Sequence, residues 1–107
     1  MTLITLAVPV TLLDGVTGTP TSDVFALPTR AALLSWQTSF NTAPAAVSIS
    51  LQVSIDGVNF VEVDSSTAVA GEVKVVSPVS ALFIKVVVAT NTGDKEITVV
   101  LLAKASA

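Results

Sequence analysis

The sequence contains no histidine, no cysteine and no tyrosine, and only 12% of its 107 residues are charged. Without cysteine there is no disulfide framework and no thiolate metal site. Without histidine or cysteine, the commonest acid–base groups and thiol nucleophiles of enzymes are absent. Gly-x-Ser-x-Gly and Gly-x-Gly-x-x-Gly motifs are also missing. These absences predict that the protein is not an enzyme and has no catalytic, cofactor-binding or metal-binding residues.

The shortage of charge also bears on partners. Soluble domains usually contain about 25% charged residues, and the net charge here is −3. The basic residues are scattered rather than clustered, so we expect no nucleic-acid binding; they are Arg30, Lys74, Lys85, Lys95 and Lys104. A surface rich in Ser, Thr, Ala and Val suggests that other chains cover part of it, which predicts a homo-oligomer. The alternative is a monomer with an unusually uncharged surface.

The first residues, MTLITLAVPVTLLDG, are apolar but carry no positive charge. Threonines and Pro9 interrupt this run well short of the roughly 18 apolar residues that span a membrane. We therefore expect no membrane association and no signal peptide, and we expect the segment to belong to the mature fold.

Apolar and polar residues alternate along much of the chain, which is the pattern of half-buried β-strands. The clearest run is VSISLQVSI at residues 47–55. Further runs occupy residues 4–12, 32–40, 59–64, 72–76, 82–88 and 97–103, with Gly, Pro, Asn or Asp between them. We predict a single all-β domain over residues 1–107. The expected architecture is an antiparallel β-sandwich, jelly-roll-like, or a small barrel, with seven to eight short strands.

Residues 1–13 allow two interpretations. Pro9 cannot donate a ladder hydrogen bond, so its strand should lie at a sheet edge or break there. The segment is then either an N-terminal arm that contacts a partner or an ordinary first strand of the sandwich. The contact residues expected of an arm are Leu3, Ile4, Leu6, Val8 and Val10.

The stretch VSIDGVNFVEV, residues 53–63, predicts a hairpin. A loop with an odd number of residues pairs Val53 with Val61 and Leu51 with Val63, which keeps all four on the core face. We therefore predict a three- or five-residue loop with a bulge, in which Gly57 or Asn59 has a positive φ. Asp56 is interpreted as a turn residue, because a calcium site, the alternative, needs about six or seven oxygen ligands.

Two aromatic residues, Trp36 and Phe40, lie on the alternating run at 32–40. Large aromatic side chains on such strands are usually part of the core. The alternative is that they stack on a sugar or a partner. Whether Trp36 is buried or exposed distinguishes these interpretations.

The region from Ala45 to Ala103 resembles a module of tailed-bacteriophage virion proteins. Its features are a Ser-x-Asp-Gly-x-Asn-aromatic hairpin, a later strand with an aromatic and a basic residue, and a final strand after a glycine-containing turn. The matching positions are Ser54, Asp56, Gly57, Asn59, Phe60, Phe83, Lys85, Gly93 and residues 97–102. Phe60 and Lys85 depart from the Trp and Arg that are usual in this pattern.

This resemblance implies a capsid decoration (cement) protein that binds outside the shell as a small oligomer, with a trimer favoured. The expected partner is the major capsid protein or another virion protein. The expected location is the virion, after synthesis in the host cytoplasm. A tail, baseplate or head-fibre component is the alternative in the same class, and a carbohydrate-binding module is the alternative from another class.

Overall fold

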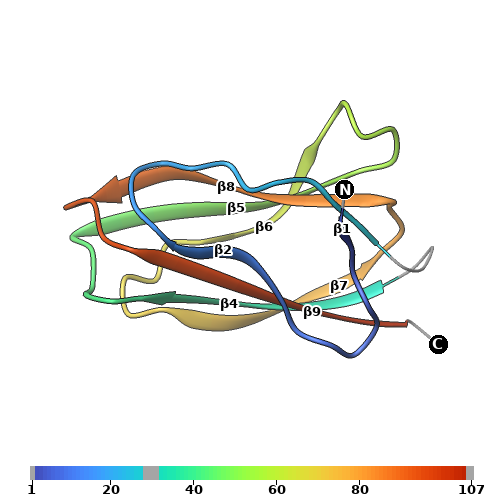
Figure 1. Cartoon of the computed structure of the whole chain (residues 1–107), viewed down its shortest axis with the longest axis horizontal. Helices are drawn as coiled ribbons and strands as arrows, with labels where there is room; N and C mark the ends of the chain where they lie inside the picture. Colours follow the sequence, from blue (N-terminus) through green and yellow to red (C-terminus); the bar gives the residue numbers. More distant parts are fainter. Residues whose placement is uncertain (1, 28–31, 106–107) are drawn as a thin grey trace.

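The computed structural model describes residues 2–27 and 32–105, which form nine β-strands and no helix. The strands are β1 (Thr2–Leu3), β2 (Val10–Val16), β3 (Phe25–Ala26), β4 (Ala32–Phe40), β5 (Ala46–Ser54), β6 (Val61–Ser66), β7 (Glu72–Val79), β8 (Phe83–Thr92) and β9 (Ile97–Ala105). Two sheets pack face to face (Figure 1). Sheet A has the order β1-β3-β8-β5-β6, and sheet B has the order β2-β9-β4-β7. The predicted all-β sandwich is confirmed. Within the described ranges, no helix could span a membrane.

The strands from β2 to β9 form a nested set of antiparallel pairs. β5 pairs with β6, β4 with β7, β3 with β8, and β2 with β9. These pairs lie alternately in sheet A and sheet B. The short strand β1 instead runs parallel to β3 at the edge of sheet A.

One apolar core fills the space between the sheets. From sheet A it receives Val47, Ile49, Leu51, Val53, Ile84, Val86 and Val88, and from sheet B it receives Leu34, Trp36, Ile97, Val99, Leu101 and Ala103. Trp36 is 1% exposed, which confirms its predicted place in the core, and Phe40 is half-buried against the same core. The prediction for Ile55 was wrong: this side chain is 70% exposed, because β5 ends at Ser54.

The register of the β5–β6 hairpin agrees with the prediction next to the connecting loop and differs further from the loop. Val53 lies opposite Val61, as predicted. A bulge between Leu51 and Gln52 then places Asp64, not Val63, opposite Leu51. We expected Val61 to face the core, but its side chain is 67% exposed. The connection is also longer than three or five residues, because residues 55–60 lie between the two strands.

The expected strand at residues 4–12 is only partly present. β2 begins at Val10, directly after Pro9, and it forms an edge of sheet B, as expected for a strand beside proline. Residues 4–9 cross from sheet A to sheet B, and Ala7 has a φ of 60° there. The crossing is held by hydrogen bonds from the Ile4 amide to the Ala26 carbonyl and from the Ala7 amide to the Ala103 carbonyl.

A polar bridge joins the sheets at the edge formed by β6 and β7. Trp36 donates from Nε1 to Asp64 Oδ2 at 2.9 Å. Lys74 on β7 lies 3.0 Å from Asp64 Oδ1 and donates to the Ser65 carbonyl at 2.6 Å. Lys74 lies opposite the buried Trp36, so its side chain points inward from the edge strand. Inward-pointing charges on edge strands disfavour pairing with other chains.

Candidate functional site

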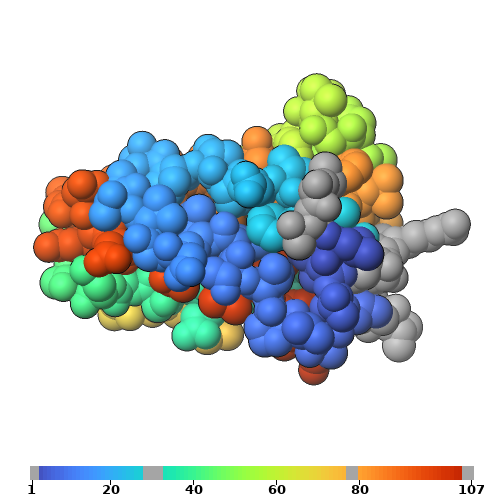
Figure 2. Space-filling model, viewed as in Figure 1, coloured from blue at the N-terminus to red at the C-terminus, as the bar shows by residue number. Residues whose placement is uncertain are grey.

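The connection between β5 and β6 projects from one end of the sandwich (Figures 1 and 2). Its shape is set by two side chains. Ser54 donates from Oγ to Asp56 Oδ1 at 2.9 Å, and the Gly57 amide donates to Ser54 Oγ at 2.9 Å. Gly57 has a φ of +78°, which confirms the glycine alternative for the positive-φ position.

Asp56 organises the rest of this loop. Its carboxylate accepts hydrogen bonds from the Val58 and Asn59 amides, both at 2.8 Å, and from Asn59 Nδ2 at 2.9 Å. The Asn59 amide, followed by the Val58 amide and the two side-chain donors, holds the pKa of the Asp56 carboxyl far below its ordinary value. The carboxylate is therefore charged at neutral pH. Its hydrogen bonds fix the conformation of the loop, as expected of a turn residue. Across the described ranges, no group of three acidic side chains lies together as a metal site.

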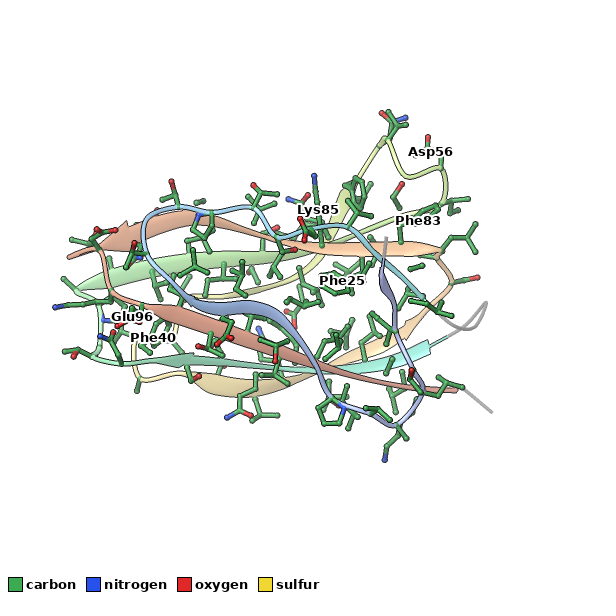
Figure 3. The ribbon with its side chains drawn as sticks, in the orientation of Figure 1. Phe25, Phe40, Asp56, Phe83, Lys85 and Glu96 are labelled. Atoms are coloured by element: carbon green, nitrogen blue, oxygen red, sulfur yellow. The ribbon has the colours of Figure 1, made fainter. Side chains whose placement is uncertain are left out.

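Two aromatic residues anchor the loop to sheet A. A Cβ atom added at Gly57 would lie 3.4 Å from the ring of Phe83, so the loop backbone passes directly over that ring. Lys85 Nζ lies 4.3 Å from the centroid of the Phe60 ring, a cation–π distance. Figure 3 shows Asp56 in the projecting loop, with Phe83 and Lys85 closer to the body of the molecule. The residues that carried the phage resemblance in this hairpin therefore form one local scaffold.

The scaffold presents apolar side chains to solvent. Ile55 is 70% exposed, Val58 80% and Val61 67%, and Leu82 of the neighbouring β7–β8 turn is 47% exposed. We call these four residues the tip site. The Leu82 amide donates to the Ser54 carbonyl, which joins the turn to the hairpin. A groove of about 380 Å³ separates the two loops and is lined by Val53, Ser54, Ile55, Asp56, Asn59, Val61, Ser80 and Ala81.

This arrangement suits binding of another apolar surface. Exposed apolar side chains normally lose water on contact with a partner, and a loop that is already ordered loses little conformational entropy on binding. The polar atoms of Asp56 and Ser54 are engaged within the loop itself. The tip site is thus a rigid apolar projection with a groove beside it.

The predicted N-terminal contact residues do not lie together on one surface. Leu3, Leu6 and Val8 are exposed. Ile4 is fully buried, and Val10 packs partly against the core. The prediction is corrected for Ile4, because this side chain is buried inside the protein's own sandwich, whereas partner contact by Leu3, Leu6, Val8 and the half-buried Val10 stays a prediction.

Sequence reasoning did not identify the tip site. Ile55 and Val61 were assigned to the core, and Val58 was not assigned a role. The available signal was the motif itself, because Ile55 and Val58 occupy the two variable positions of Ser-x-Asp-Gly-x-Asn. In this loop the fixed positions bond to one another, and the side chains at the two variable positions are exposed.

Comparison with known proteins adds no assignment: no protein-family model matches the chain, and no curated protein matches its sequence.

Proposed function

We propose that this chain is a bacteriophage virion structural protein, a capsid decoration protein that binds the outer surface of the shell and stabilises it. The observation that carries the proposal is the tip site, where the hairpin resembling a phage virion module presents three strongly exposed apolar side chains on a hydrogen-bonded loop. We also infer that the nested strand pairing is a jelly-roll topology.

The proposed mechanism is physical rather than catalytic. Insertion of the tip site into an apolar depression between major capsid subunits removes Ile55, Val58 and Val61 from water. A ligand that binds only the assembled state stabilises that state by mass action. Separation of the capsid subunits then also requires loss of this contact. In this proposal the protein is located in the virion, and its partner is the major capsid protein.

A binding assay with matched variants tests this function. The double substitution Ile55→Ser and Val58→Ser removes apolar surface that is already exposed, so the protein should fold normally. Binding to expanded empty shells of the same virus should weaken about tenfold or more, as for central contact residues of other interfaces. The control is Val69→Ser, a 38% exposed valine between β6 and β7. Equal binding by the double variant and the control would contradict the proposal.

The alternatives predict other outcomes of the same assay. A tail, baseplate or head-fibre component should bind purified tails or baseplates, and not shells. The carbohydrate-binding alternative required an exposed aromatic side chain, and Trp36, its expected stacking residue, is 1% exposed and bonded to Asp64. We therefore do not propose this alternative.

A further inference from the structure

The outward-facing side chains of β9 have an unusual order. Val99, Leu101 and Ala103 are fully buried, so the alternate positions point away from the core. Within β9 these outward positions are Thr98, Val100, Leu102 and Lys104, and Glu96 directly precedes the strand at the same spacing. An acid therefore lies at one end of the row and a base at the other, and both are exposed. Figure 3 shows Glu96 at the end of the molecule opposite to Asp56, and β9 runs from there towards the other end in Figure 1.

The neighbouring strands extend the apolar centre of this row. Ser35 lies opposite Leu102 on one side and Val75 on the other, and Gln37 lies opposite Val100 and Val73. Val73 and Val75 are 67% and 68% exposed. A hollow of about 200 Å³ lies in this face, lined by Pro9, Ser35, Trp36, Gln37, Val73, Val100 and Leu102. We call this surface the sheet B face. It consists of Ser35 and Gln37 of β4, Val73 and Val75 of β7, and the row from Glu96 to Lys104 along β9, namely Glu96, Thr98, Val100, Leu102 and Lys104.

The outer face of sheet A differs in character. There Gln52 lies between Glu62 and Lys85, so charged residues occupy the middle of that face. On the sheet B face, the charged residues lie at the ends and the middle is uncharged. The acidic end also contains Asp14, which is exposed and lies beside Gly15, whose amide donates to Thr98 Oγ1.

We propose that the sheet B face packs against the same face of a second copy of this chain, about a two-fold axis close to Val100, with the two β9 strands antiparallel. Glu96 and Lys104 are each four residues from Val100, or roughly 13 Å along the strand. The two-fold rotation therefore places Glu96 of each copy near Lys104 of the other. The apolar centres meet at the spacing of about 10 Å that is usual for packed sheets.

Charge complementarity identifies the occupant as a second copy. A two-fold interface uses one patch on both subunits, so the patch must complement itself. A row with an acid at one end, a base at the other and no charge between them meets this condition in the antiparallel orientation. The parallel orientation would place like charges together. This pairing is independent of the proposed function, and it predicts a dimer in place of the trimer that the phage resemblance implied.

Charge reversal with mixing tests the proposal on the purified protein, without shells. Lys104→Glu alone should place acids opposite each other at both ends of the interface, and Glu96→Lys alone should place bases opposite each other. Each variant should raise the dimer dissociation constant about tenfold or more. An equimolar mixture of the two variants restores opposite charges at both ends, so dimers should form again as heterodimers. Sedimentation equilibrium measures the dissociation constants.

Two further variants keep the test decisive. Glu96 accepts a hydrogen bond from Asn41 Nδ2 at 3.0 Å, so circular dichroism must show that Glu96→Lys is folded. If Glu96→Lys is not folded, Asp14→Lys takes its place in the test, because it reverses a charge at the same end of the face. Val100→Lys should place two positive charges at the axis and give monomers. A monomeric wild-type protein at about 100 µM, above the micromolar range in which specific interfaces associate, would overturn the proposal, as would single variants that dimerise like the wild type.

Discussion

At the scale of single residues, Asp64 shows how one carboxylate can hold two sheets together. It accepts a hydrogen bond from the buried Trp36 on β4 and pairs with Lys74 on β7, while it belongs to β6 of the other sheet. Burial raises the pKa of the Asp64 carboxyl, but the hydrogen bonds from Trp36 and Lys74 outweigh burial and hold the pKa below its ordinary value of 3.8. The ionised form is therefore favoured by folding.

This pKa shift predicts loss of stability in acid. A carboxyl with a lower pKa in the folded state stabilises the protein above its unfolded-state pKa, near 3.8, and the stabilisation disappears as the pH falls through the folded-state value. Asp64→Asn should lower the free energy of unfolding by about 1–2 kcal/mol at pH 7, and by less at pH 2. Urea unfolding at both pH values measures the difference. The control is Glu62→Gln, an exposed carboxylate on the same strand; an equal loss there would contradict this role.

The sequence contained no sign of this bridge. The run at residues 59–64 indicated a strand, but alternation along one strand predicts only which side a residue faces and not its partner on another strand. The bulge between Leu51 and Gln52 shifts the register so that Asp64 lies opposite the buried Leu51. A one-residue shift turns each later side chain to the other face. A bulge has no distinct pattern in a single sequence, so the partner of Trp36 could not be predicted.

At the scale of elements, the first segment illustrates why composition alone did not separate an arm from a strand. Ile4 is fully buried, and Leu12 and Leu13 are both in the core, so strict alternation ends within β2. Register shifts between Thr11 and Leu13 account for two successive buried leucines. The sequence correctly indicated an edge position from Pro9. It did not indicate the change of sheet between Ile4 and Val10.

Substitutions in this segment should therefore divide into two groups. Ile4→Ala should lower the free energy of unfolding by about 2–4 kcal/mol, because it leaves a cavity in the core. Leu3→Ser, at a 64% exposed side chain, should change it by about 0.5 kcal/mol or less. Chemical denaturation of both variants provides the measurement. Deletion of residues 2–12 removes Ile4 and part of β2, so we expect a poorly folded protein. A truncated protein with normal thermal stability would restore the interpretation as an arm.

At the scale of the whole molecule, period-two alternation was enough to predict the class of fold but not the interaction surfaces. Residues 47–53 and 97–103 alternate cleanly because each strand has one face in the core. The same alternation occurs around Val73 and Val75, but these two valines point outward and are exposed. Their apolar side chains look the same in the sequence as those of buried valines. Burial within the chain and burial by a partner leave the same pattern in a sequence. Only the register of β4, β7 and β9 shows which valines are on the outer face.

The nested pairing also predicts the order of folding. The innermost pair joins Val53 to Val61, whereas the outermost pair joins Val10 to Leu101. Closing the longer loop first would cost roughly 2 kcal/mol more in chain entropy. The β5–β6 hairpin should therefore form early and β2 should dock late, in a reaction taking milliseconds to seconds. Stopped-flow kinetics of Val53→Ala should give a φ-value of about 0.5–0.8, and those of the buried Leu13→Ala about 0–0.3. The reverse order of these values would show that folding begins at the outer pair, with the chain termini brought together before the central hairpin.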